Sequence, residues 1–428
     1  NVFSYGFTRL GVAQSGVSGP SIAFDGLSTL QNFTRGFNRI IPTTNLVNDL
    51  TWTKGTHTVQ TGINFRLVQN DRNSFANSFP SYSFSRNTLR GLGADISDAV
   101  NAFIKQRSGN AGLSLSETQP TQRAMGDLLG LINNYSGVYN FGRDGQAIPF
   151  GQPLARSFGT REYEFYVQDV WKMRRDLTLT YGLRYGSYQV PYEKNGVQVV
   201  STTGLDVYLA ERVGASMAGV SGATMPNAAL TYALGGPANN GKGWYQRDNN
   251  NFAPRFNVAY APVSDGFFGK LFGKGSVIRA GGSMLYDRYG SDMVTNFDRA
   301  GSPGLASSVT QPRNTNFTDA FRYNGSALPQ LPTVAGAKFP YTPATIVGGF
   351  GSFSGVFPGL VAPYSMLMNI NYARQLPGKI TVEVGYVGRL ARKSLVQVDV
   401  FQPLTQFKDP KSGQTWAQAA SILRGYNL

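Results

Sequence analysis

The sequence contains no cysteine and a single histidine, His57, among its 428 residues. Disulfide frameworks and thiol chemistry are therefore excluded, and zinc sites, which are built mainly from Cys and His, have almost no ligands available. A Ser-His-Asp triad would depend on His57 alone, and this residue lies at the edge of a tight turn. We therefore expect no catalytic residue, no metal and no cofactor, and a protein that is not an enzyme.

Charged residues are also scarce, at 15% of the chain. The 39 Lys and Arg exceed the 24 Asp and Glu, but they are scattered and form no basic arm, so we expect no nucleic-acid partner. Long hydrophobic runs are missing too, because prolines and glycines interrupt the longest uncharged stretch, 339–373. Any crossing of a membrane must therefore use a β-barrel.

Glycine and aromatic residues are abundant, with 51 Gly, 28 Phe and 22 Tyr, which favours a sheet with many turns. Segments that alternate between apolar and polar residues form four predicted hairpins: 45–53 with 57–69, 161–171 with 177–188, 252–260 with 276–288, and 364–374 with 379–388. The connections between hairpins, 70–160, 189–251 and 289–363, are unusually long. Short turns that alternate with long loops predict an all-β, antiparallel transmembrane β-barrel whose extracellular loops carry short helices.

The polar face of these strands is expected to line the lumen, and its candidate residues are Asn64, Arg66, Arg184, Arg255, Arg279 and Glu383. Aromatic residues recur on the apolar face at two levels. Those beside the short turns are Trp52, Trp171, Tyr260 and Tyr372, and those further along are Phe65, Tyr185, Tyr286 and Tyr386. The interval spans about 20 Å, close to the apolar band of such barrels, so we predict two aromatic girdles. Asp169 resists this scheme, since it shares the face of Trp171 and would meet lipid unless it lies among the head groups or a bulge shifts the register.

The long connections contain local patterns. Residues 95–106 and 416–423 have helical spacing, the second with Gly425 as a stop signal, whereas 125–139 fits either a helix or a strand. Gly349-Phe350-Gly351 begins a dinucleotide-like pattern but is expected to be a flexible loop. No signal peptide is visible, and Asn1 lies almost inside a strand, so we interpret residues 1–428 as part of a longer protein.

Several of these segments resemble the barrel of TonB-dependent receptors, in particular the Oar-like branch. The matching segments are Asp49–Trp52 with Gly55–Val59, Tyr166–Trp171 running into Leu177–Tyr185, Asn251–Phe256, Val277–Gly281 with Tyr286–Arg288, and Arg374–Gly378 leading into Glu383–Gly388. Each is weak alone, but their order and spacing match over most of the chain. The resemblance implies that 1–428 is part of a 22-stranded barrel and that the plug, the TonB box and the N-terminal regulatory-like domain are absent from it.

The resemblance also implies partners: outer-membrane lipid, the plug of the same full-length chain, the TonB complex and a solute that the sequence does not identify. The lumen arginines could bind an anionic solute or pair with acidic plug residues. We expect a receptor in the outer membrane for uptake of a bulky nutrient such as an oligosaccharide, a peptide or a metal chelate. The alternatives are an adhesion or secretion-associated structural barrel, and a soluble β-sandwich that binds glycans.

Overall fold

In a computed structural model of the chain, the described residues are 1–27, 34–92, 101–103, 105–107, 115–218, 220, 224–225, 228–262, 272–273, 275–289, 293, 302–311, 321–343, 354–396 and 408–426. The longest strands are β1 (Val2–Gln14), β3 (Phe37–Lys54), β4 (His57–Ser74), β8 (Leu154–Arg174), β9 (Leu177–Tyr188), β13 (Asn251–Tyr260), β14 (Ser276–Tyr286), β17 (Tyr364–Leu376) and β18 (Ile380–Arg392). They form one antiparallel sheet in that order, with the short β10 (Tyr192–Glu193) attached to β8.

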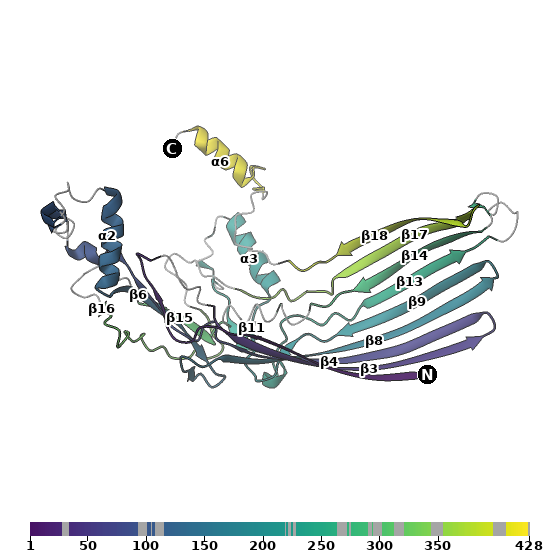
Figure 1. Cartoon of the computed structure of the whole chain (residues 1–428), viewed down its shortest axis with the longest axis horizontal. Coiled ribbons are helices and arrows are strands. Elements are labelled where there is room, and N and C mark those ends of the chain that lie inside the picture. The colour runs from purple at the N-terminus through teal and green to yellow at the C-terminus, as the bar shows by residue number, and fades with distance from the viewer. Residues whose placement is uncertain are drawn as a thin grey trace.

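The four predicted hairpins are all present as β3-β4, β8-β9, β13-β14 and β17-β18, and their short-turn ends lie together on the right in Figure 1. Glycine allows two of the turns, because Gly55 and Gly378 have φ angles of 60° and 80° that other residues rarely adopt. The strands extend further than predicted: β3 and β4 have 18 residues each and β8 has 21. A transmembrane strand needs only about 9–11 residues, so the sheet continues well beyond the thickness of a membrane.

The long connections were expected to be loops with short helices, and this prediction is wrong in part. Together with the segment between β1 and β3, they contain two further sheets. β2 (Ser21–Ala23), β5 (Ser81–Phe84), β6 (Leu131–Phe141), β7 (Ala147–Ile148), β15 (Ala306–Thr310) and β16 (Phe321–Arg322) form one sheet, in which β2 and β5 are parallel. β11 (Val199–Ser201) and β12 (Tyr232–Leu234) form the other. We call the part built from these sheets and their helices the distal region. Strands this short and separated by irregular segments lack the periodicity by which the hairpins were predicted.

The described helices of this region include η1 (Arg86–Leu92), α2 (Leu115–Leu128), α3 (Leu205–Met217) and η3 (Pro237–Asn239). The undecided segment 125–139 proves to be both helix and strand: α2 ends at Leu128, Gly130 turns the chain with a φ of 66°, and β6 begins at Leu131. The predicted C-terminal helix is confirmed as α6 (Trp416–Gly425), which begins with a capping box between Thr415 and Gln418. The described part of the predicted helix 95–106, residues 101–103, 105 and 106, is helical, and the rest of it lies outside the described residues, as does the Gly349-Phe350-Gly351 segment.

The hydrophobic core lies almost entirely in the distal region. One cluster joins Val199, Tyr208, Leu230, Tyr232 and Leu305, a second joins Phe158, Val200 and Trp244, and a third joins Tyr82, Phe84 and Ile132. On the large sheet, by contrast, apolar side chains remain uncovered: Ile63 is 49% exposed, Val382 42% and Ile370 53%. Soluble proteins rarely leave so extensive an apolar surface open to water.

The large sheet is open over the part of the chain that the structure describes, since β1 and β18 each pair with one strand. A closed barrel of 22 strands therefore stays a prediction. Within the described ranges, no helix has both the length and the apolar character needed to cross a membrane.

Candidate functional site: the inner face of the sheet

Strand register sorts the large sheet into two faces. Residues directly opposite one another in neighbouring strands point to the same side, so a row can be followed from strand to strand. One row runs from Asn64 to Glu164 and on to Gly186, and another from Arg66 through Glu162 to Tyr188. All six residues predicted to line the lumen fall on this side, which we call the inner face: Asn64, Arg66, Arg184, Arg255, Arg279 and Glu383.

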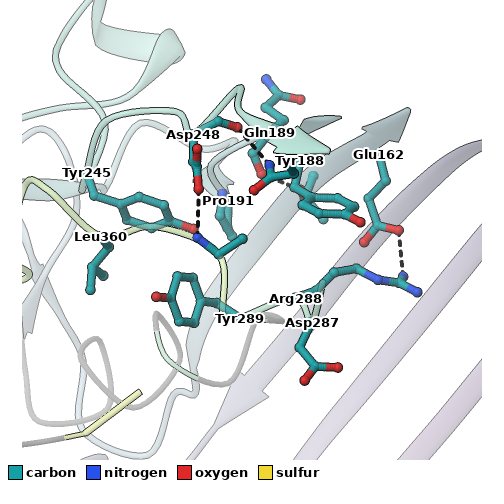
Figure 2. A pocket seen from close by; sticks show the side chains of 13 residues that line it. Glu162, Tyr188, Gln189, Pro191, Tyr245, Asp248, Asp287, Arg288, Tyr289 and Leu360 are labelled. Carbon is teal, nitrogen blue, oxygen red and sulfur yellow. Dashed lines mark hydrogen bonds and ion pairs between the residues drawn. The ribbon is translucent and has the colours of Figure 1, made fainter. Parts of the chain in front are cut away.

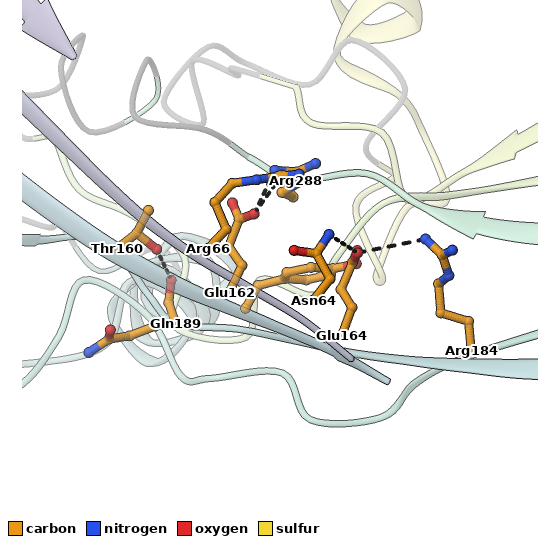
Figure 3. Close-up of polar contacts among 9 residues, drawn as sticks. Asn64, Arg66, Thr160, Glu162, Glu164, Arg184, Gln189 and Arg288 are labelled. Atoms are coloured by element: carbon orange, nitrogen blue, oxygen red, sulfur yellow. Dashed lines mark hydrogen bonds and ion pairs between the residues drawn. The ribbon is translucent and has the colours of Figure 1, made fainter. Parts of the chain in front are cut away.

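Glu162 is the centre of the strongest ion-pair group on the inner face. Its Oε2 lies 3.0 Å from Nη1 of Arg66 on β4 and 2.6 Å from Nη1 of Arg288, which follows β14. Figure 3 shows both guanidinium groups converging on this one carboxylate. β14 is three strands away from β8 in the sheet, so Arg288 links parts of the wall that are not neighbours. A carboxylate that is only 8% exposed needs this compensation, because a buried charge without partners is costly.

Glu164, two residues further along β8, has longer contacts. It accepts a hydrogen bond from Asn64 at 3.4 Å and one from the Tyr188 hydroxyl at 3.3 Å, and it forms an ion pair with Arg184 at 3.6 Å. Arg66 and Arg184 are thus already paired within the sheet. The expected pairing of these two arginines with acidic plug residues is not needed to balance their charge.

A glycine makes room for another cross-strand contact on this face. Gly62 lies in one row with Asp49 on β3 and Tyr166 on β8, and a Cβ at this position would come within 2.4 Å of Asp49 and 2.6 Å of the Tyr166 ring. Without that Cβ, the Tyr166 ring lies across β4 and donates a hydrogen bond to Asp49 at 2.6 Å. Close approach of this kind explains a glycine in the middle of a strand.

The remaining predicted lumen residues are more open. Arg255 donates a hydrogen bond to Gln168 at 3.0 Å, and Glu383 accepts one from Asn371 at 2.6 Å. Arg279 lies opposite Ala259 and Asn371 and is exposed. The structure therefore does not unite the six residues in one site but distributes them over the width of the sheet.

A small cavity opens where the inner face meets the distal region (Figure 2). It measures about 50 Å³, and its lining residues include Glu162, Tyr245, Asp248, Arg288 and Tyr289. Asp248 accepts hydrogen bonds from the backbone nitrogens of Ala362 and Asn250. Burial beside Tyr289 raises the pKa of the Tyr245 hydroxyl, so it stays protonated at neutral pH. The cavity has room for water molecules but not for a bulky solute, since ligand sites are usually several times larger.

The eight aromatic residues predicted as girdles all lie on the opposite side, the outer face. Some form direct pairs across strands: Phe65 with Tyr163 at 4.9 Å between ring centroids, Tyr185 with Phe252 at 4.9 Å, and Tyr286 with Tyr364 at 5.7 Å. By register, Trp52, Trp171, Tyr260, Tyr372 and Tyr386 share this face. That these residues mark the two membrane interfaces stays a prediction.

Comparison with known proteins assigns the two-faced sheet to a family. The model of a family described as "Outer membrane beta barrel domain" matches residues 2–426. The chain belongs to this outer membrane β-barrel family. Its place is therefore the outer membrane, and the soluble β-sandwich is excluded, in agreement with the uncovered apolar face.

One solved structure is similar over a limited share of its own length. The outer membrane transporter YddB from Escherichia coli is similar at a TM-score of 0.40 and 12% identity, over 91% of this chain and 31% of the transporter. No curated protein matches the sequence. The outer membrane barrel assignment thus rests on the family match, and the finer resemblance to TonB-dependent, Oar-like receptors stays a prediction.

In an outer membrane barrel, Asp169 on the outer face needs an explanation, and the structure gives one. No bulge shifts the register at Asp169; the irregularity comes later, between Lys172 and Arg174. The carboxylate instead contacts Nδ1 of His57 at 2.6 Å and accepts a hydrogen bond from the Tyr181 hydroxyl at 2.9 Å. The His57 ring also stacks on Trp171, with centroids 5.3 Å apart. His57 thus satisfies an acid on the lipid side of the barrel, close to the short turns.

The described residues include no group of three or more His, Asp or Glu placed to bind a metal ion.

Proposed function

We propose that this barrel serves TonB-dependent uptake of a bulky solute across the outer membrane: an oligosaccharide, a peptide or a metal chelate. In this proposal the barrel encloses a plug formed by the same full-length chain, and the TonB complex supplies the force that moves the plug. The resemblance of the hairpin segments to TonB-dependent receptors is the starting point, and the inner face supplies the physical support.

One observation supports the proposal more than the others: a wall of nine successive strands is still open over the described residues, and its inner face carries the six polar or charged residues predicted to line the lumen. Barrel diameter grows with strand number, and barrels of about 16 or more strands leave an aqueous channel while about 22 strands enclose a plugged lumen. A wall that has not closed after nine strands fits this larger class. A lumen of that size admits a bulky solute and would leak without a plug.

The arginines on the inner face differ in what they can do in such a lumen. Arg66 and Arg184 are paired with Glu162 and Glu164, so they stiffen the wall. Arg279 is exposed and Arg255 is held only by a neutral amide, so these two are the better candidates for contact with the plug or an anionic solute.

The test compares growth of the source bacterium with and without the full-length gene, in strains with intact and deleted TonB. Maltooligosaccharides, peptides and ferric chelates serve in turn as the limiting nutrient. We expect one class to support growth that needs both the gene and TonB. Two outcomes would contradict the proposal. In the first, growth on all three classes of nutrient is the same with and without the gene; in the second, growth needs the gene but not TonB.

The structured distal region favours a second candidate, an adhesion or secretion-associated barrel. Three buried clusters give this region a core of its own, and folded surfaces of that kind often carry binding functions. Surface attachment that is lost with the gene and unchanged without TonB would support this candidate.

A further inference from the structure

The short-turn end of the large sheet is strongly basic. Its described turn residues include six exposed cations: Lys54, Lys172, Arg174, Arg175, Arg374 and Lys379. We call this set the turn-end rim. Among the described turn residues it faces one acid, Asp176, whose Oδ1 lies 3.3 Å from Nε of Arg174. The nearest further acid on the outer face, Asp169, is only 9% exposed and is bound by His57 and Tyr181.

Three of these cations share the outer face with an aromatic residue that precedes them on the same strand. Lys54 follows Trp52 on β3, Arg174 follows Trp171 on β8 after the bulge, and Arg374 follows Tyr372 on β17. In each case the order along the strand is aromatic ring first, cation second, turn last. The cations therefore lie one step further from the middle of the membrane than the rings.

At the first of these positions the groups are in contact. The Lys54 ammonium lies 5.8 Å from the centre of the Trp52 ring, within the range of a cation–π interaction. Lys54 is also the register partner of His57, whose ring stacks on Trp171. Two indole rings and a cation thus form one continuous surface over β3, β4 and β8.

A similar surface lies where the connection between β13 and β14 meets the end of β17. Tyr372 packs against Phe272 with ring centroids 6.3 Å apart, and its hydroxyl donates a hydrogen bond to the Phe272 carbonyl at 2.7 Å. The Arg374 guanidinium lies against Gly273, where a Cβ would come within 2.5 Å of its carbon. The chain thus holds a cation beside an aromatic pair at a second, separate place on the same rim.

We propose that the turn-end rim binds the phosphate groups of anionic phospholipids in the leaflet at the short-turn side. Aromatic rings suit the boundary between acyl chains and head groups, and cations just beyond them suit the phosphates. The charge imbalance of the rim selects an anionic head group over a zwitterionic one. This inference needs only the outer membrane location and does not depend on the proposed transport.

The test uses the full-length protein in phosphatidylcholine vesicles that contain a fraction of dibrominated lipid, which quenches nearby tryptophans. Dibrominated phosphatidylglycerol and dibrominated phosphatidylcholine with the same acyl chains are compared. The fluorescence of Trp52 and Trp171 is obtained as the difference between the parent and a Trp52→Phe/Trp171→Phe variant. We expect phosphatidylglycerol to quench this signal with at least about fivefold higher apparent affinity.

Replacing the three outer-face cations, by Lys54→Gln, Arg174→Gln and Arg374→Gln together, is expected to abolish the preference. The matched control, Arg161→Gln, Arg392→Gln and Lys393→Gln, removes three exposed cations at the opposite end of the sheet and should keep it. An equal response of the parent to both lipids, or equal loss in both triple variants, would overturn the proposal. The proposal would also be overturned if added inorganic phosphate abolished the preference while chloride at the same ionic strength did not. That result would identify a site for free anions.

Discussion

At the scale of single residues, the inner face is held by contacts that cross from strand to strand. Glu162 receives two guanidinium groups, one from the adjacent strand β4 and one from beyond β14. The Arg288 contact joins strands that share no backbone hydrogen bonds, so it acts on the curvature of the wall rather than on one strand pair. Glu164, with longer contacts to Asn64, Tyr188 and Arg184, lacks such a link.

Replacing Glu162 by Gln should therefore destabilise the barrel. The change leaves Arg66 and Arg288 without their shared counter-charge, and we expect a loss of about 2 kcal/mol in the free energy of unfolding, as is typical for hydrogen bonds to charged groups. Urea unfolding of the full-length protein in lipid vesicles measures it. Glu164→Gln is the matched control and should cost clearly less. An equal effect of the two substitutions would show that the Arg288 link carries no special weight.

At the scale of elements, alternation along the strands determines which side meets lipid. The apolar and polar residues of β4 separate cleanly, with Ile63 on the outer face and Asn64 next to Glu164 on the inner one. Because side chains alternate with a period of two, this much could be predicted from the sequence without any knowledge of the partner strands. The pairing of Glu162 with Arg288 could not, since it depends on curvature over several strands.

Ile63→Arg should block assembly in the outer membrane, whereas Asn64→Arg should be tolerated. Ile63 is six residues from the turn, close to the middle of the apolar band, where an arginine facing lipid costs about 2–4 kcal/mol. An arginine at position 64 instead points into the lumen beside the Glu164 carboxylate. Assembly is measured on cold SDS gels, as the difference in mobility between unheated and heated samples of the full-length protein. Equal tolerance of both substitutions would argue against lipid exposure of this face.

The junction between α2 and β6 depends on one glycine. Gly130 has a φ of 66°, and a Cβ there would come within 2.1 Å of the Tyr323 carbonyl oxygen. Gly130→Ala should destabilise the distal region by about 2 kcal/mol, because strain and a backbone clash act together. Gly126, inside α2, meets nothing closer than 3.6 Å, so Gly126→Ala should stabilise by up to about 1 kcal/mol. Proteolysis of intact cells at rising temperature distinguishes the two; equal protection in both variants would contradict this assignment.

At the scale of the whole molecule, the hairpins and the outer membrane location could be predicted from the sequence, but the distal region could not. The hairpins can be predicted because every strand that faces lipid needs an apolar face, which gives the sequence a regular alternation. In the distal region, residues such as Tyr82, Tyr232 and Leu305 come from separate connections and are buried only when those connections meet. A core assembled from distant short segments has no local periodicity, so the sequence of these stretches predicts only loops.

The distal region should lose stability in alkali. Burial raises the pKa of Tyr232 to about 12, whereas the unfolded phenol ionises near pH 10. The stability that this residue contributes is therefore complete below pH 10 and is lost as the pH rises to 12, by about 2–3 kcal/mol in total. Tyrosine absorbance and proteolysis between pH 9 and 12 measure the transition.

Tyr232→Phe should flatten this pH dependence, since phenylalanine cannot ionise. Tyr426→Phe is the matched control, because Tyr426 is 71% exposed and should leave the profile unchanged. If Tyr232→Phe unfolds over the same pH range as the parent, another group must govern the alkaline transition.

The length of β8 has a consequence for what approaches the cell. Its 21 residues extend about 70 Å, or about 50 Å along the membrane normal at a usual tilt, against an apolar band of about 25 Å. Trp171 lies only three residues from the short-turn end of β8, so nearly all of the surplus rises on the other side. With Trp171 at the predicted membrane interface, an incoming molecule, whether nutrient, phage or antibody, thus meets a protein wall that rises about 20 Å above the hydrocarbon.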